Sequence, residues 1–161
     1  MDRLRELAEQ VGHALQKKRW LLATAESITG GSISQAITDV PGSSEWFDCG
    51  FATYSNISKT EFLDVPAALI AQEGAVSEEV AAAMAAGVLA NTDADVTLAT
   101  TGIAGPSGAV PGKPVGTVCF AWAHGSMVHT ERHVFSGDRQ AVRAQTTEFA
   151  LQGLLKFMEQ L

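Results

Sequence analysis

The chain has 161 residues, of which 46% are hydrophobic and 18% are charged, and this composition excludes a disordered or fibrous protein. Its formal net charge of -7 excludes broad, sequence-independent binding to nucleic acid, which requires clustered Lys and Arg, but leaves room for a local phosphate pocket. No apolar run reaches the ~18 residues that a membrane span needs. We therefore expect one domain over residues 1–161, with no nucleic-acid or membrane partner.

The first half of the chain alternates between helical and strand-like patterns. Apolar periodicity predicts a helix over 2–18, a strand over 20–25, a helix over 32–39, a strand over 46–55, and short helices over 56–63 and from 66. The first helix is charged and lacks the apolar core of a secretion signal, so we expect a cytoplasmic protein. Cys49 and Cys119 are then expected to be free thiols.

The second half begins with the clearest helix, over 76–92, for which Ser77 is a good N-cap. The elements after it are predicted as a strand over 96–102, a Gly- and Pro-rich loop over 103–114, a hairpin over 115–135 turning near His124-Gly125, and a helix over 137–161 capped by Ser136. Alternating strands and helices predict an α/β fold, a three-layer α/β/α sandwich. The hairpin makes its sheet mixed, mostly parallel and of about five strands.

The segment TAESITGGS ends the first predicted strand with a serine, Ser27, and closes with two glycines. Ser27 or Thr29 could cap the next helix, while Gly30 and Gly31 let the chain turn. Ser27 could instead be a nucleophile, with backbone N–H groups of Thr29, Gly30 and Gly31 binding an oxyanion or a phosphate. The local pattern leaves both interpretations open.

A serine nucleophile needs a base, and none of the four histidines falls at a predicted carboxyl strand end beside a carboxylate. Tyr54 and Lys59 lie near the end of the second predicted strand, where both could face the same cleft as Ser27. A desolvated lysine can accept the serine proton, and a tyrosine hydroxyl can relay it. The alternative is a tyrosine at the rim and a solvated lysine.

A second glycine loop, TTGIAGPSG, follows the strand over 96–102. Thr101, Gly102 and Gly105 there indicate either a ligand crevice at the sheet edge or simple turns. Arg139 and Arg143, four residues apart on the last helix, could clamp a phosphate or form a solvated face. The sequence contains no spacing of His, Cys or carboxylates typical of a metal site.

Four separated motifs together resemble the CinA C-terminal domain family, in the same order and over about residues 5–155. They are TAESITGGSISQAITDVPGSSEWFDCGFATYSNISK, GAVSEEV, TTGIAGPSG with the following KPVGTVCFA, and FSGDRQAVR. The resemblance implies hydrolysis of the carboxamide of nicotinamide mononucleotide to nicotinate mononucleotide and ammonia, a step of pyridine-nucleotide salvage. It also implies that Ser27, Tyr54 and Lys59 are catalytic and that no metal or cofactor is needed. Ile28 stands where that family often has Cys.

The same resemblance implies a small nucleotide as substrate, with its ribose phosphate held by Arg143, by Arg139 and by the loop at Thr101-Gly102. Members of the family commonly self-associate, so the resemblance implies that this protein could form a homodimer. The family's longer members carry a metal-dependent pyrophosphatase domain, whose activity we do not expect here. Two other functions stay open: a nucleotide-binding module without catalysis, and a serine amidase for another small amide.

Overall fold

The computed structural model describes residues 2–161. Its helices are α1 (Arg3–Lys18), α2 (Ser32–Thr38), α3 (Asn56–Leu63), α4 (Ala67–Glu73), α5 (Glu78–Asn91) and α6 (Arg139–Glu159), with a 3-10 turn η1 (Ser43–Glu45). Its strands are β1 (Leu22–Glu26), β2 (Phe47–Ala52), β3 (Val96–Gly102), β4 (Thr117–His124) and β5 (Met127–Val134). In this part of the chain, no helix is both long and apolar enough to cross a membrane.

The strands form one five-stranded sheet in the order β2-β1-β3-β4-β5. β1 lies at its centre between β2 and β3 and is parallel to both, whereas β4 is antiparallel to β3 and to β5. Four strands therefore share one direction and β4 alone opposes them, which confirms the predicted mixed, mostly parallel sheet. As a consequence, the carboxyl ends of β2, β1 and β3 meet at one edge of the sheet.

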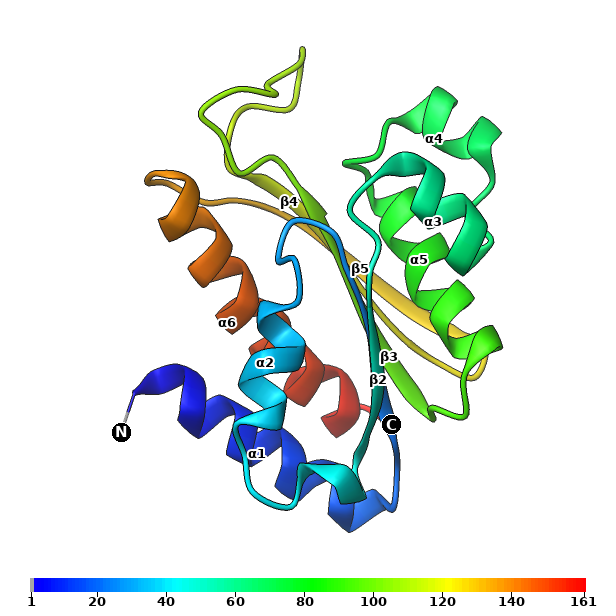
Figure 1. The fold of residues 1–161 in the computed structure, drawn as a ribbon, viewed down its shortest axis with the longest axis vertical. Helices are drawn as coiled ribbons and strands as arrows, with labels where there is room; N and C mark the ends of the chain where they lie inside the picture. The colour runs from blue at the N-terminus through cyan, green and yellow to red at the C-terminus, as the bar shows by residue number, and fades with distance from the viewer. Residues whose placement is uncertain (1) are drawn as a thin grey trace.

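Helices cover both faces of the sheet, which confirms the three-layer α/β/α sandwich (Figure 1). One hydrophobic cluster joins the sheet to α1, α2 and α6, through residues such as Leu15, Leu98 and Leu154. A second cluster joins the opposite face to α3, α4 and α5, through residues such as Met84 and Ala99. The Ala-rich α5 packs directly against β3 and β4 because its small side chains allow a close approach.

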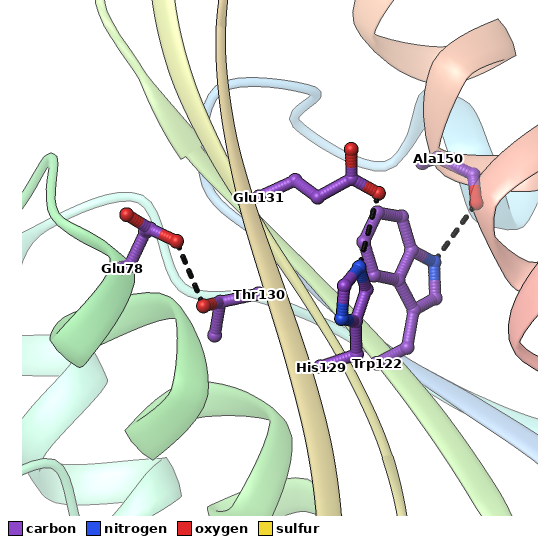
Figure 2. A network of polar contacts seen from close by, with 6 residues as sticks. All are labelled: Glu78, Trp122, His129, Thr130, Glu131 and Ala150. Carbon is purple, nitrogen blue, oxygen red and sulfur yellow. Dashed lines mark hydrogen bonds and ion pairs between the residues drawn. The ribbon is translucent and has the colours of Figure 1, made fainter.

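Alternate residues of the edge strand β5 face the two helical layers, as Figure 2 shows. The hydroxyl of Thr130 donates to the Glu78 carboxylate at the start of α5, at 2.8 Å. On the other face His129 stacks on Trp122, whose indole N–H donates to the Ala150 carbonyl of α6, at 3.1 Å. These contacts fasten α5 and α6 to the antiparallel part of the sheet.

Most element boundaries agree with the predictions, and the exceptions concern helix starts and one strand end. Ser77 caps α5 and the hairpin turns after His124, as predicted. The prediction that Ser136 caps the last helix is wrong, because Asp138 is the N-cap and its side chain accepts from the Ala141 N–H. The strand predicted over 46–55 ends at Ala52, so Tyr54 lies in the connection to α3. Cys49 and Cys119 are free thiols.

Candidate active site

Ser27 follows directly after β1, at the middle of the sheet edge where three parallel strands end. Its backbone N–H donates to the Thr100 carbonyl of β3 at 3.0 Å, which continues the strand pairing by one residue. The backbone then leaves the sheet through a turn at residues 27–31 and enters α2. Because β1 pairs with a strand on each side, the position of the residue that follows it is fixed by the centre of the sheet.

Lys59 of α3 contacts Ser27 directly. The distance between its Nζ and the Ser27 Oγ is 2.9 Å, and Nζ also donates to the carbonyls of Thr53 and Tyr54, at 2.9 Å each. Only 1% of Lys59 and 7% of Ser27 is exposed. The structure therefore brings Lys59 to Ser27 and buries it, which excludes the alternative of a solvated lysine, while its catalytic role stays a prediction.

The surroundings of Lys59 disfavour its ammonium form. Burial lowers the pKa of this lysine from 10.5 to about 8. Within residues 2–161 no carboxylate forms an ion pair with it. A neutral amine has two N–H donors and one lone pair, so it can donate to the two carbonyls and accept the hydrogen of the Ser27 hydroxyl. The structure therefore places a buried amine with a lowered pKa in contact with the Ser27 hydroxyl.

The turn after Ser27 is closed by the carboxylate of Glu26, and not by a serine or threonine cap. Gly31 is the N-cap of α2 and provides no side-chain hydrogen bond. Glu26 accepts from the Gly31 N–H at 3.2 Å and from the Ile33 N–H at 2.9 Å. The interpretation of Ser27 or Thr29 as the helix cap is therefore wrong, since a carboxylate from the preceding strand already fills that role.

The two glycines serve the path of the turn. Gly30 and Gly31 have positive φ values of 58° and 107°, which side chains with a Cβ rarely adopt. The Gly30 N–H donates to the Ser27 carbonyl at 3.1 Å, and the Gly31 N–H is held by Glu26. Among the described residues, the N–H groups of Ile28 and Thr29 find no acceptor. These two amides are the ones on the turn that remain for a ligand.

Tyr54 contacts Ser27 and Lys59 through its backbone carbonyl and not through its side chain. Its carbonyl accepts from Lys59, and it lies 3.5 Å from the Ser27 Oγ. The phenol is 63% exposed, and its hydroxyl accepts from Arg139 at 3.1 Å. The contacts of the described residues therefore link the tyrosine hydroxyl to the arginine and do not link it to Ser27 or Lys59.

The two arginines of α6 hold different segments around the site. Arg139 donates to the Gly105 carbonyl at 2.8 Å as well as to Tyr54. Arg143 donates to the carbonyls of Ile28 and Thr29, at 3.1 and 3.4 Å. It therefore contacts the turn from the face of the sheet that α6 covers, opposite to the face that carries Lys59. Arg143 also lines a surface cavity of about 450 Å³, together with Ser32, Gln140 and Thr147.

The second glycine loop begins beside the turn, and its predicted residues have structural contacts. The Thr101 hydroxyl donates to the Ala75 carbonyl at 2.8 Å. A Cβ at Gly102 would lie 2.9 Å from the Ile28 side chain, so glycine there permits close packing against the turn. In the part of the chain that the structure describes, no three His, Cys, Asp or Glu side chains gather closely enough to hold a metal ion.

Comparison with known proteins shows the family to which this chain is similar. The family model of the CinA C-terminal domain matches residues 4–158. The nicotinamide-nucleotide amidohydrolase PncC of Pseudomonas putida is 52% identical over 97% of this chain and 98% of its own length. The protein of the same name from Escherichia coli K12 is 50% identical over 94% of this chain and 92% of its own length.

Solved structures show the same fold. A crystal structure of a competence-damaged protein (CinA) superfamily protein from Klebsiella pneumoniae superposes with a TM-score of 0.96, at 37% identity, over 99% of this chain and 100% of that one. The competence/damage inducible protein CihA from Agrobacterium tumefaciens superposes with a TM-score of 0.93, at 35% identity, over 97% of this chain and 96% of that one.

Proposed function

Because this chain belongs to the CinA C-terminal domain family, we propose that it hydrolyses the carboxamide of nicotinamide mononucleotide to nicotinate mononucleotide and ammonia. The observation that carries the proposal is the 2.9 Å contact between the Ser27 Oγ and the buried amine of Lys59. The names of relatives about half identical over nearly the whole chain supply the substrate. The reaction would serve pyridine-nucleotide salvage, with no cofactor taking part.

In the first step neutral Lys59 accepts the hydroxyl proton of Ser27 while the Ser27 Oγ attacks the carboxamide carbon. The carbonyl oxygen gains the negative charge of a tetrahedral intermediate. The unpaired N–H of Ile28, with that of Thr29 beside it, is our candidate donor to this oxygen, because an amide next to the nucleophile is well placed for it. An N–H without an acceptor is costly once water is excluded from it, and an oxyanion would satisfy it.

In the second step the intermediate collapses and its C–N bond breaks. The leaving nitrogen takes the proton from the Lys59 ammonium and departs as ammonia, which leaves an ester on Ser27 and a neutral lysine. Water then attacks the ester while Lys59 accepts a proton from the water. The Lys59 ammonium returns this proton to the Ser27 oxygen as the ester C–O bond breaks, and the acid product leaves as nicotinate mononucleotide after losing its proton to solvent. The Tyr54 hydroxyl, bound to Arg139, is more suited to contacting the substrate than to moving this proton.

We assign the ribose phosphate to the arginine side of the turn. Arg143 contacts the turn directly after Ser27, and Arg139 lies between the Tyr54 hydroxyl and the Gly105 carbonyl. Guanidinium groups bind phosphate oxygens through paired, charge-assisted hydrogen bonds. The loop at Thr101-Gly102 would border the same ligand.

Nicotinamide mononucleotide is therefore expected to be deamidated with a kcat/KM at least about 10²-fold above that of nicotinamide, since phosphate contacts contribute roughly 3 kcal/mol or more. Initial rates of ammonia release with each compound measure this ratio. Equal rates would remove the phosphate site and support an amidase for another small amide. Tight calorimetric binding of the mononucleotide without any ammonia release would instead support a binding module without catalysis.

The rate should depend on pH as the neutral fraction of Lys59 does. With a pKa of about 8, the lysine is mostly protonated at neutral pH and loses its proton as the pH rises. We expect kcat/KM to rise about tenfold per pH unit below that value and to level off above it. Ammonia release measured from about pH 6 to pH 10 tests this. A flat profile, or one that falls over this range, would exclude Lys59 as the base.

A further inference from the structure

Glu26 is an ionisable residue that the proposed reaction does not use, although it immediately precedes the nucleophile. Its side chain is 1% exposed and no cation pairs with it among residues 2–161. Its Oε1 accepts from the N–H groups of Gly31 and Ile33, and its Oε2 accepts from the Ser34 N–H at 2.9 Å and the Ser34 hydroxyl at 2.6 Å. The Thr24 hydroxyl also donates to Oε2, at 3.4 Å, so five donors stabilise a buried charge that would otherwise be costly.

These contacts join the two ends of the turn at residues 27–31, which contains the proposed nucleophile. Glu26 belongs to β1 and is paired with Ala52 and Thr100 in both neighbouring strands, so its position is fixed by the sheet. Its carboxylate fixes the first residues of α2 to the same point. Residues 27–30 are therefore held at both ends, with Ser27 at the first position.

The hydrogen bonds of Glu26 to α2, which we call the Glu26 clamp, also determine which backbone N–H groups remain for a substrate. Glu26 takes the N–H groups at the start of α2, and the Gly30 N–H is taken by the Ser27 carbonyl. The N–H groups of Ile28 and Thr29 are left over, while Arg143 donates to the carbonyls of these two residues.

We propose that Glu26 is a positioning residue of the acyl-transfer site: by clamping α2 to the end of β1, it holds Ser27 and the Ile28 N–H in the geometry that stabilises the oxyanion. This inference rests on the proposed serine mechanism. Glu26→Gln is the sharpest variant, since it keeps the size of the side chain. Whichever way the amide is turned, its NH2 faces donors that a carboxylate oxygen accepts from in the wild type.

Two substrates separate this role from the identity of the natural substrate. With nicotinamide mononucleotide, we expect Glu26→Gln to lower kcat about 10- to 100-fold and leave KM within about twofold, since the oxyanion forms only after binding. With p-nitrophenyl acetate, which carries no nucleotide, acylation of Ser27 should fall by a similar factor. An ester reaction that depends on Glu26, without ammonia release from the mononucleotide, would support the clamp and reject the proposed substrate.

Ser34→Ala is the milder companion variant, because it removes one donor to Glu26 and keeps the carboxylate. We expect it to fold normally and to lower the acylation rate about three- to tenfold. Glu6→Gln, on the exposed face of α1, is the matched control and should behave as wild type. If Glu26 only capped α2, Glu26→Gln would lower the unfolding midpoint while folded protein acylated at the wild-type rate, and that result would overturn the inference.

Discussion

Replacing Ser27 by alanine is expected to lower kcat for ammonia release from nicotinamide mononucleotide by at least about 10³-fold. The change removes the attacking oxygen, and water held at the same place would lack the covalent step. The Ser27 hydroxyl contacts only Lys59 and the Tyr54 carbonyl among the described residues. Because these contacts lie at the sheet edge and not in the hydrophobic core, alanine should leave the fold intact. Binding of the mononucleotide should persist, since the arginines and the turn remain.

Steady-state kinetics and calorimetry on the same Ser27→Ala preparation test this expectation. Ser43→Ala is the matched control, because Ser43 is another buried serine, 8% exposed, and lies in η1 away from the site. It should keep the wild-type kcat. Full activity in Ser27→Ala would remove the serine from the mechanism and return it to the role of a turn residue.

Replacing Lys59 by arginine or by methionine is expected to lower kcat/KM by at least about 10³-fold in both cases. The base must lose its proton, and a guanidinium keeps its positive charge at every pH of interest. Methionine removes the charge and the lone pair while filling a similar apolar volume. If Lys59 acted as a fixed positive charge, arginine would preserve much of the activity and methionine would not.

The pair of variants thus separates a proton acceptor from an electrostatic contact. Kinetics at about pH 7 and pH 9 give the measurement, since the wild-type rate should rise over this interval and the variants should show no such rise. Lys17→Met, exposed at the end of α1, is the control for loss of a positive charge and should show the wild-type profile. Thermal unfolding of each variant establishes that it is folded. A substantially active Lys59→Arg enzyme would refute the base assignment.

The architecture was predictable because its signals are local and repeated. The alternation of apolar strands and helices, and the hairpin near His124-Gly125, suffice for a mixed three-layer sandwich. The pairing of Ser27 with Lys59 was also accessible, since both lie beyond strands whose carboxyl ends share an edge. The sequence could not reveal the two carbonyls that hold the amine, because backbone acceptors carry no residue signature.

The errors of the sequence analysis concern the residue that caps a helix and the hydrogen-bond partners of charged side chains. Ser136 and Asp138 are both good cap residues, and only the backbone path decides that Asp138 is the N-cap. The contacts of Glu26 were missed because its partners in α2 and the turn before it lie five to eight residues later in the chain, outside the spacing of known capping motifs. One signal was present: a carboxylate ends an otherwise apolar strand, and a buried charge there requires donors. The contacts of Arg139 and Arg143 with backbone carbonyls likewise depend on tertiary structure.

The most direct test of the proposed activity is to measure ammonia and nicotinate mononucleotide together, after the purified protein is incubated with nicotinamide mononucleotide in excess chelator. The mechanism predicts both products in equal amounts from the wild type and neither from Ser27→Ala. It would be contradicted by release of nicotinamide, by loss of wild-type activity under chelation, or by equal product formation in the two proteins.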